Sequence, residues 1–263
     1  MKRIFHAIKK YLIRDPLYFF LYAARDLQLN HRERCIFYSE EEISRLIRER
    51  KSIVRLGDGE IANIHYLDIT PQHFSKELQH DLRKMIIGYK DDSSYVIGIP
   101  IFVNYSNREL DALGEGKRGL WLPLKVTFDM IFNKNAKYLD AHLFYRTGRF
   151  EKIILNYILQ KKIILVTNEK NIEKTKNLPF SEHIFEYIAC APINAYDKRE
   201  QLKRDIIDTI AKSSLPKENF VILFSAGSAK TIIPELSAMG YQLLDVGTGY
   251  EAYAHNLSLE DRI

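Results

Sequence analysis

Short apolar runs alternate with longer amphipathic stretches along most of this chain, and this alternation constrains its fold more than any other feature. The runs have the length and β-branched composition of buried strands. We expect strands at residues 52–56, 95–99, 163–167, 184–189, 220–224 and 242–246. Strands that alternate with helices form a mainly parallel sheet with right-handed crossovers. The sequence therefore predicts an α/β fold, Rossmann-like, with a mainly parallel sheet flanked by helices.

Helix start signals support this reading. Ser39 precedes three glutamates and predicts a helix to about Arg50. Thr70-Pro71 predicts the start of a helix that ends near Tyr89. Residues 106–118 are polar and glycine-bearing without a clear period, so we expect a loop that could act as an active-site flap. Further helices are expected at 122–133, 149–160, 195–212 and 229–239.

Composition restricts the function classes. The chain has 263 residues, is 46% hydrophobic and carries a formal charge of +5. Five basic residues within positions 2–14 match that excess, so the rest is nearly balanced and does not predict a nucleic-acid surface. Cys35 and Cys190 match no metal or redox spacing, which predicts reduced cysteines and suits the cytoplasm.

The N-terminus reads as a helical extension, residues 1–38, before a domain of residues 39–263. Residues 2–14 are basic and amphipathic, and residues 16–24 are apolar and aromatic but too short to span a bilayer. A secretion signal fits poorly because Arg14 and Asp15 adjoin the apolar run. Residues 2–24 could form a peripheral contact with the inner face of the cell membrane. Packing on the domain, or on a partner subunit in a homodimer, is the alternative.

An acidic motif follows the first long apolar run. Gly57 and Gly59 alternate with Asp58 and Glu60, directly after Arg55-Leu56. In an extended chain the two carboxylates would project to the same side. Hard cations take carboxylate oxygens and share them with substrate phosphates, so the motif predicts half of a site for Mn²⁺ or Mg²⁺. A turn with two solvated acids is the plain alternative.

Three more loops follow predicted strands, at the sheet edge where open α/β sheets bind ligands. Ser225–Ser228, with Gly227, precedes a helix whose first N–H groups favour an anion, and Lys230 adds charge, although the P-loop pattern is absent. Asn194 and Asp197 could bind a ligand at this edge, or Asn194 could cap the following helix. The third loop contains Asp245, Gly247 and Thr248.

The third loop also resembles the glycine motif of class I methyltransferases. That motif follows the first strand of their fold, with most of the catalytic fold after it. Only 14 residues follow Gly249 here. A methyltransferase would therefore require a permuted fold, and this reading ranks last.

Three blocks in order resemble the GT-D fold glycosyltransferases, which carry an Asp-x-Glu motif. The blocks are Arg55-Leu-Gly-Asp-Gly-Glu60, Ala191-Pro-Ile-Asn-Ala-Tyr-Asp-Lys198, and Ser225-Ala-Gly-Ser-Ala-Lys-Thr231 with Gly240-Tyr-Gln-Leu-Leu-Asp-Val-Gly247. The resemblance implies a nucleotide-sugar donor and Mn²⁺, with Asp58 and Glu60 near the metal and the diphosphate. The family usually has His where this chain has Thr248, and Glu251 or His255 could compensate for it.

These observations predict a hexosyltransferase of the GT-D type that moves a sugar from a nucleotide-diphosphate sugar, expected to be a UDP-sugar, to a glycan or lipid-linked acceptor. Asp58 and Glu60 are the expected catalytic and metal-binding residues. The expected donor-binding residues are Arg55, Gly57, Gly59, Asn194, Asp197, Ser225, Gly227, Ser228, Lys230, Asp245, Gly247 and Thr248. A metal-dependent phosphohydrolase and a non-catalytic sugar-nucleotide-binding scaffold are the alternatives.

Overall fold

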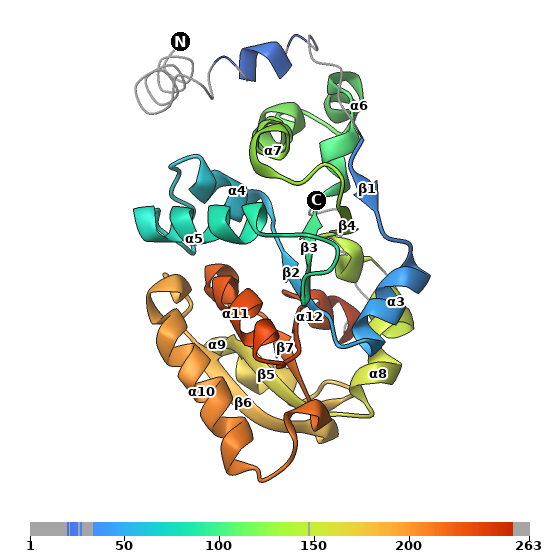
Figure 1. The fold of residues 1–263 in the computed structure, drawn as a ribbon, viewed down its shortest axis with the longest axis vertical. Coiled ribbons are helices and arrows are strands. Elements are labelled where there is room, and N and C mark those ends of the chain that lie inside the picture. Colours follow the sequence, from blue (N-terminus) through green and yellow to red (C-terminus); the bar gives the residue numbers. More distant parts are fainter. Residues whose placement is uncertain (1–19, 21, 26, 28–33, 147, 255–263) are drawn as a thin grey trace.

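One parallel sheet of eight strands organises the computed structural model, which describes residues 20, 22–25, 27, 34–146 and 148–254 (Figure 1). The strand order is β1-β4-β3-β2-β8-β7-β5-β6, and each pairing between neighbours is parallel. The strands are β1 (Ile36–Phe37), β2 (Ser52–Arg55), β3 (Tyr95–Ile99), β4 (Lys137–Asp140), β5 (Lys162–Asn168), β6 (Ile184–Cys190), β7 (Phe220–Phe224) and β8 (Leu243–Asp245). The expected α/β fold with a parallel sheet is confirmed.

Helices cover both faces of this sheet. One core cluster combines strand residues with apolar side chains of α4 (Asp58–Ile64), α5 (Lys76–Ile87), α7 (Lys117–Ile131), α10 (Arg199–Lys212) and α11 (Ile233–Ala238). The cluster on the other face includes residues of α3 (Glu40–Arg48), α8 (Asn156–Ile158) and α12 (Gly249–Ala254). Neighbouring β2 residues Ile53 and Val54 belong to different clusters, because successive side chains of a strand point to opposite faces.

The six predicted strands are confirmed as β2, β3, β5, β6, β7 and β8. The sequence analysis missed β1 and β4. β1 has two residues, and the four-residue run Lys-Tyr-Leu-Asp of β4 has a charge at each end. Neither run is long or apolar enough to stand out by periodicity.

The predicted loop at residues 106–118 is wrong. α6 (Asn107–Ala112) begins there with Ser106 and Glu109 in a reciprocal capping box, a signal that was present in the sequence. α7 already begins at Lys117, after a break in which Gly114 and Gly116 have positive φ.

Other helix boundaries also shift. The helix expected from Pro71 begins only at Lys76, because Ser75 is its N-cap. Short 3₁₀ turns, Ala195–Lys198 and Gly227–Ile232, precede α10 and α11. α9 (Glu169–Thr175) was not predicted, and the helix expected at 149–160 consists of a π-helical turn, Glu151–Leu155, followed by α8.

Most of residues 2–24, the predicted membrane contact, lies outside the described residues. Of the described part, Tyr22 packs edge-on against His65, which follows α4. Just after this segment, Arg25 forms an ion pair with Asp129 of α7. The boundary at residue 39 stays a prediction, although β1 precedes it and pairs with β4. None of the helices in the described part of the chain combines the length and apolar character that a membrane span requires.

Candidate active site at the carboxyl ends of the strands

The acidic motif lies in the first turn of α4, directly after β2, and not in an extended loop. Two residues apart on a helix, the Asp58 and Glu60 side chains diverge by about 200°. Asp58 is exposed, whereas Glu60 is buried and its Oε2 accepts the Gly57 N–H at 2.8 Å. The expectation that both carboxylates project to the same side is therefore wrong.

Glu60 belongs to a buried charge network, which we define as Arg55, Glu60, Lys230 and Asp245. The Lys230 ammonium lies 3.1 Å from Glu60 Oε1 and 3.1 Å from Asp245 Oδ2. It also donates to the Arg55 carbonyl oxygen at 2.8 Å. The Arg55 guanidinium lies 3.4 Å from Asp245 Oδ1. All four residues are at most 7% exposed.

Neighbouring charges in the network favour the ionised forms of Lys230 and Asp245. Burial lowers the pKa of Lys230, but the carboxylates of Asp245 and Glu60 outweigh it, and the pKa lies above its ordinary value. Burial raises the pKa of Asp245, but Lys230 and Arg55 bring it below its ordinary value. Each of the three Lys230 N–H donors has a protein acceptor. Lys230 thus orients the two carboxylates, and the sequence-based view of it as a free charge for a diphosphate does not fit this arrangement.

Gly247 makes room for the network. Its φ is +52°, and a Cβ atom there would lie 1.9 Å from an Arg55 guanidinium nitrogen and 2.6 Å from the Tyr145 hydroxyl. Its N–H donates to Asp245 Oδ1 at 3.2 Å. Gly247, which the sequence predicts to bind the donor, therefore has a packing role in the structure. Thr248 follows it, and its carbonyl accepts the N–H of Glu251 at the start of α12.

A pocket of about 160 Å³ opens beside Glu60. It lies at the carboxyl ends of β5, β6 and β7, and its wall contains Ser225, Gly227 and Ser228. The structure therefore brings three predicted donor-binding residues to Glu60. The other lining residues are Ile69, Pro71, Gln72, Asn168, Cys190, Ala191, Pro192, Ala195 and Ala226.

Asn194 joins two loops beside this pocket. With φ at +54°, its N–H donates to the Pro71 carbonyl at 2.8 Å, and its Oδ1 accepts the His73 N–H at 2.9 Å. Its side chain does not cap the following turn, so the capping alternative is wrong. Asp197 is exposed in that turn and does not line the pocket.

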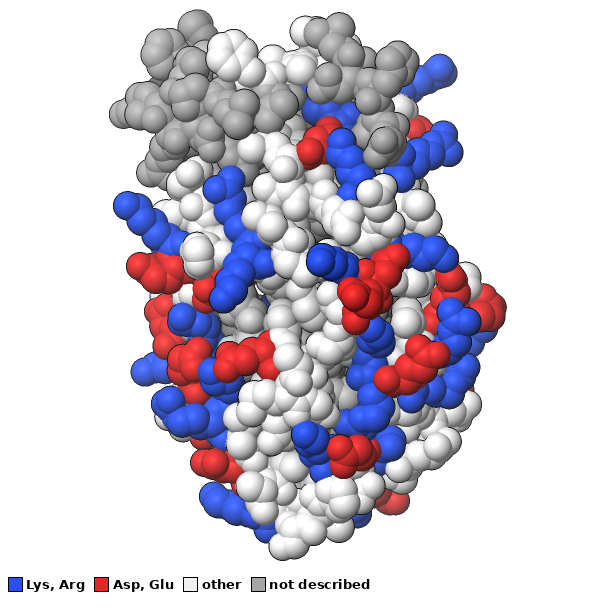
Figure 2. All heavy atoms as spheres, viewed as in Figure 1, with Lys and Arg blue, Asp and Glu red and all other residues white. Residues whose placement is uncertain are grey.

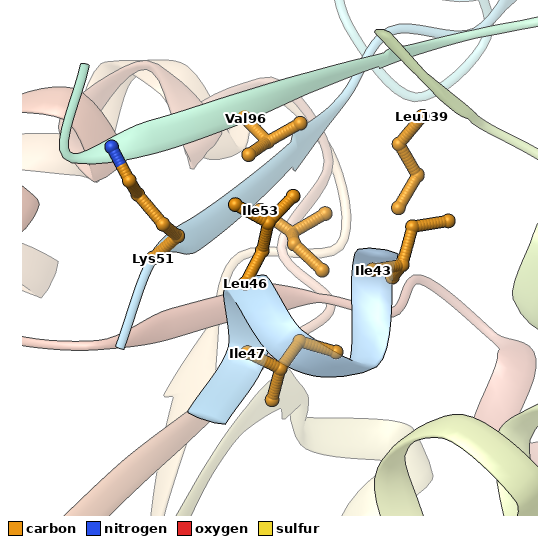
Figure 3. Close-up of a pocket in the computed structure, with 7 residues that line it drawn as sticks. All are labelled: Ile43, Leu46, Ile47, Lys51, Ile53, Val96 and Leu139. Carbon is orange, nitrogen blue, oxygen red and sulfur yellow. The ribbon is translucent and has the colours of Figure 1, made fainter. Parts of the chain in front are cut away.

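A different space lies between α3 and the sheet (Figure 3). Its lining is apolar apart from Lys51, whose nitrogen points away and donates to the Ser93 carbonyl. No group in it can bind a polar substrate, so we assign this space to core packing.

The sequence analysis missed residues on the β4 side of the network. Arg55 donates to the Tyr145 hydroxyl at 3.1 Å and to the Ala141 carbonyl at 2.8 Å. Asp140 and His142 lie beside them at the end of β4. The rule that strand ends carry functional residues would have indicated them, had β4 been recognised.

The side chains available as metal ligands limit how a metal ion could bind. Among the described residues, no group of three or more His, Cys, Asp and Glu side chains could hold an ion. Both Glu60 oxygens have protein partners, whereas Asp58 has none within the described part of the chain. A preformed cage does not fit this arrangement. A cation that takes one carboxylate and shares the oxygens of a diphosphate does fit.

Comparison with known proteins gives the same fold. The glycosyltransferase of Streptococcus sanguinis with the domain of unknown function 1792 is 21% identical, with a TM-score of 0.70, over 86% of this chain and 87% of that one. A second structure of that domain, described as a distinct glycosyltransferase fold, is 19% identical, with a TM-score of 0.63, over 86% and 84%. The comparison with curated proteins gave no match.

The sequence itself matches the family described as glycosyltransferase GT-D fold over residues 53–263. This range contains the acidic motif, the pocket loops and the whole charge network. The resemblance found in the three sequence blocks is thereby confirmed. The chain belongs to the GT-D fold family of glycosyltransferases.

Proposed function

We propose that this glycosyltransferase moves a sugar from a nucleoside diphosphate sugar, expected to be a UDP-sugar, to a glycan or lipid-linked acceptor in surface polysaccharide or glycoprotein glycan synthesis. The observation that supports this most is the meeting of Glu60 with Ser225, Gly227 and Ser228 in one pocket. The pocket lies at the carboxyl edge of the sheet, near β2 and β8, where the strand order reverses.

A departing diphosphate needs groups that stabilise negative charge. The first N–H groups of the turn Gly227–Ile232 have no partner within the turn and can donate to phosphate oxygens. In this proposal Gly57 lets a ligand approach the backbone beside Glu60. Gly59 instead gives room to Ile69, whose Cδ1 would lie 2.7 Å from a Cβ atom at that position. In this proposal Arg55, Lys230, Asp245 and Gly247 act indirectly, by fixing Glu60 beside the diphosphate.

We further propose that Asp58 and Glu60 bring a divalent cation, Mn²⁺ or Mg²⁺, to the donor. When bound, the cation would act as a Lewis acid that neutralises charge on the leaving diphosphate. Asp58 supplies the free carboxylate, and Glu60, held by Lys230 and the Gly57 N–H, presents its charge from the pocket wall. We also assign Thr248 and Asn194 to the binding site for the sugar donor, and Asp197 to the edge of that site.

A thermal-shift panel of nucleotide sugars, with and without Mn²⁺, tests the proposal. Binding to the native state raises Tm according to the ratio of ligand concentration to Kd. We expect UDP-sugars with Mn²⁺ to give the largest shifts. Donor consumption without an acceptor product would favour a phosphohydrolase, and binding without turnover would favour a scaffold. No shift with any nucleotide sugar would reject the donor assignment.

Residues 2–24 carry a separate proposal, which comes from the sequence alone. We propose that they bring the enzyme to the inner face of the cell membrane, near a lipid-linked acceptor, because five basic residues adjoin an aromatic run. Flotation with anionic liposomes at low salt should carry the full chain, and a variant without residues 2–24 should stay behind. Failure of the full chain to float would instead favour packing on the domain or a homodimer contact.

A further inference from the structure

A second group of side chains lies on the opposite side of the charge network from the pocket. We define the His142 cluster as Phe102, Trp121, Asp140, His142, Tyr145 and Arg146. The His142 ring centroid lies 5.8 Å from that of Phe102, 5.8 Å from that of Trp121 and 6.0 Å from that of Tyr145. Three aromatic rings therefore surround one imidazole at the carboxyl end of β4.

The cluster also presents polar groups. The backbone N–H of His142 donates to Asp140 Oδ1 at 3.1 Å, and Arg146 forms a 2.6 Å ion pair with Asp140 Oδ2. His142 Nδ1 and Trp121 Nε1 are buried and have no hydrogen-bond partner within the described part of the chain. Trp121 is only 3% exposed. Buried polar atoms without partners are rare and unfavourable, so two of them in adjacent rings indicate a place for ligand hydroxyl groups.

The charge state of the cluster favours a neutral ligand. Burial, with Arg55, Arg146 and Lys117 nearby, lowers the pKa of His142 to about 3. The neutral imidazole can both donate and accept a hydrogen bond, as a sugar hydroxyl requires. Aromatic rings offer large apolar faces against which the C–H face of a sugar can pack. A diphosphate would instead need cations, and Arg146 is already paired with Asp140.

The cluster is joined to the proposed reaction centre. The Arg55 guanidinium lies 4.7 Å from the Tyr145 ring centroid and donates to the Tyr145 hydroxyl. Through Asp245 and Lys230 the same contacts reach Glu60. β4 lies on one side of β2 and β5 lies on the other (Figure 1), so the cluster and the pocket flank Glu60 along one sheet edge. A transferase requires two binding sites that flank the reacting bond.

We propose that the His142 cluster is the subsite for the acceptor sugar ring, with His142 and Trp121 hydrogen-bonded to its hydroxyl groups and the aromatic rings against its apolar face. This proposal rests on the proposed sugar transfer, because it assigns the pocket beside Glu60 to the donor. Asp140 and Arg146 are positioning residues that hold the loop containing His142.

Trp121 is the only tryptophan of the chain, so its fluorescence reports on the cluster directly. The test titrates the full-length protein with methyl glycosides of glucose, galactose, mannose, rhamnose, N-acetylglucosamine and N-acetylgalactosamine. We expect at least one glycoside to change the emission in a saturable way. His142→Phe should weaken that response about tenfold, on the scale of one lost hydrogen bond to a ligand, and His142→Gln should restore part of it. Calorimetry should show UDP affinity within about threefold of native.

A matched control is His183→Phe. His183 is exposed and precedes β6, at the opposite end of the strands. It should leave the glycoside response unchanged, and melting curves should show that the variants are folded. Figure 2 shows that charged side chains are scattered across the displayed face, so weak ionic binding elsewhere is best excluded by using neutral glycosides.

Three results would overturn the subsite. The first is the absence of a response to any glycoside by a protein that still binds UDP-sugars. The second is competition between UDP and the glycoside for the same fluorescence change, which would assign the cluster to the nucleotide. The third is an unchanged response in His142→Phe. A native protein that binds glycosides but no nucleotide sugar would contradict the proposed function itself, and with it the acceptor role.

Discussion

Asp58 and Glu60 are two residues apart in the sequence, but they belong to different regions of the molecule. Glu60 lies in the charge network, where Lys230 and the Gly57 N–H take both of its oxygens. Asp58 is exposed in the first turn of α4, a position we call the rim; it does not line the pocket and has no partner among the described residues. About 200° of helical rotation separates them, so a motif that looks like a matched pair contains one carboxylate fixed from inside and one open to a ligand.

The comparison shows how substitutions should differ. Network residues act through one another, so removing one should reduce stability as well as activity. Rim residues act directly on the ligand and should affect activity alone.

Lys230→Ala should lower the free energy of unfolding by about 3–5 kcal/mol, because it leaves the buried Glu60 and Asp245 carboxylates without their cation. Urea denaturation measures the change. Lys203→Ala is the matched control, since Lys203 also contacts two carboxylates, of Glu200 and Glu235, but at the exposed surface. It should cost at most about 1 kcal/mol. Equal losses in the two variants would contradict the network's role.

Glu60→Gln should reduce sugar transfer at least about a hundredfold, on the scale of one lost electrostatic contact in the transition state. It should also lower stability by about 1–3 kcal/mol, because Lys230 loses one buried anionic partner. Initial rates and melting curves on the same preparation measure both effects. A stable variant with full activity would remove Glu60 from the site.

On the β4 side of the network, His142 should make the stability of the protein depend on pH. The folded-state pKa of His142, about 3, lies below its unfolded value of about 6.5. Between these two values the unfolded chain binds a proton that the folded chain does not. The contribution of His142 to stability is therefore complete above pH ~6.5 and is lost as the pH falls toward 3. Between pH ~6.5 and pH ~5 alone we expect a loss on the order of 2 kcal/mol, at about 1.4 kcal/mol per pH unit, and a smaller loss in His142→Gln. The difference between the two pH–stability curves isolates His142, and parallel curves would show that it is already solvated.

Asn194→Ala should have the smallest effect, about 1 kcal/mol, from the lost bond to the His73 N–H and a strained positive φ. Asn194→Gly keeps the backbone conformation accessible and isolates the hydrogen bond. Chemical denaturation compares the two. If UDP affinity falls in both while stability stays native, Asn194 binds the donor and is not a link between loops.

Periodicity predicted β2, β3 and β7, which are buried on both faces, because apolar runs of this kind leave few alternatives. It also predicted β6 as a buried strand, but β6 lies at the edge of the sheet and is mostly exposed or half-buried. β4 was missed because its four residues are stabilised by pairing with β3 and β1, which local sequence does not encode. The capping signal at Ser106 and Glu109 was readable, but the glycines that follow it hid the helix. These errors in single elements did not change the predicted fold class.

The site was predicted in part. Strand-end reasoning found Glu60 and the Ser225–Ser228 loop, which do share a pocket. It could not find that Lys230 is satisfied by three protein acceptors, since these come from residues 55, 60 and 245. It could not show either that Asp58 is exposed and Glu60 is buried, because this depends on whether a helix or a turn begins at Gly57 and Gly59.

The division between network and rim is tested by the turnover of a UDP-sugar by Asp58→Asn with Mn²⁺ present, measured as UDP release from the donor that binds best in the thermal-shift panel. Asp58 is exposed and has no protein partner among the described residues, so Tm should stay native. We predict that kcat/KM falls at least about a hundredfold, as for the loss of a charge that acts in the transition state. Near-native turnover by this variant would contradict the assignment of Asp58 to the cation and the donor, and with it the division between network and rim.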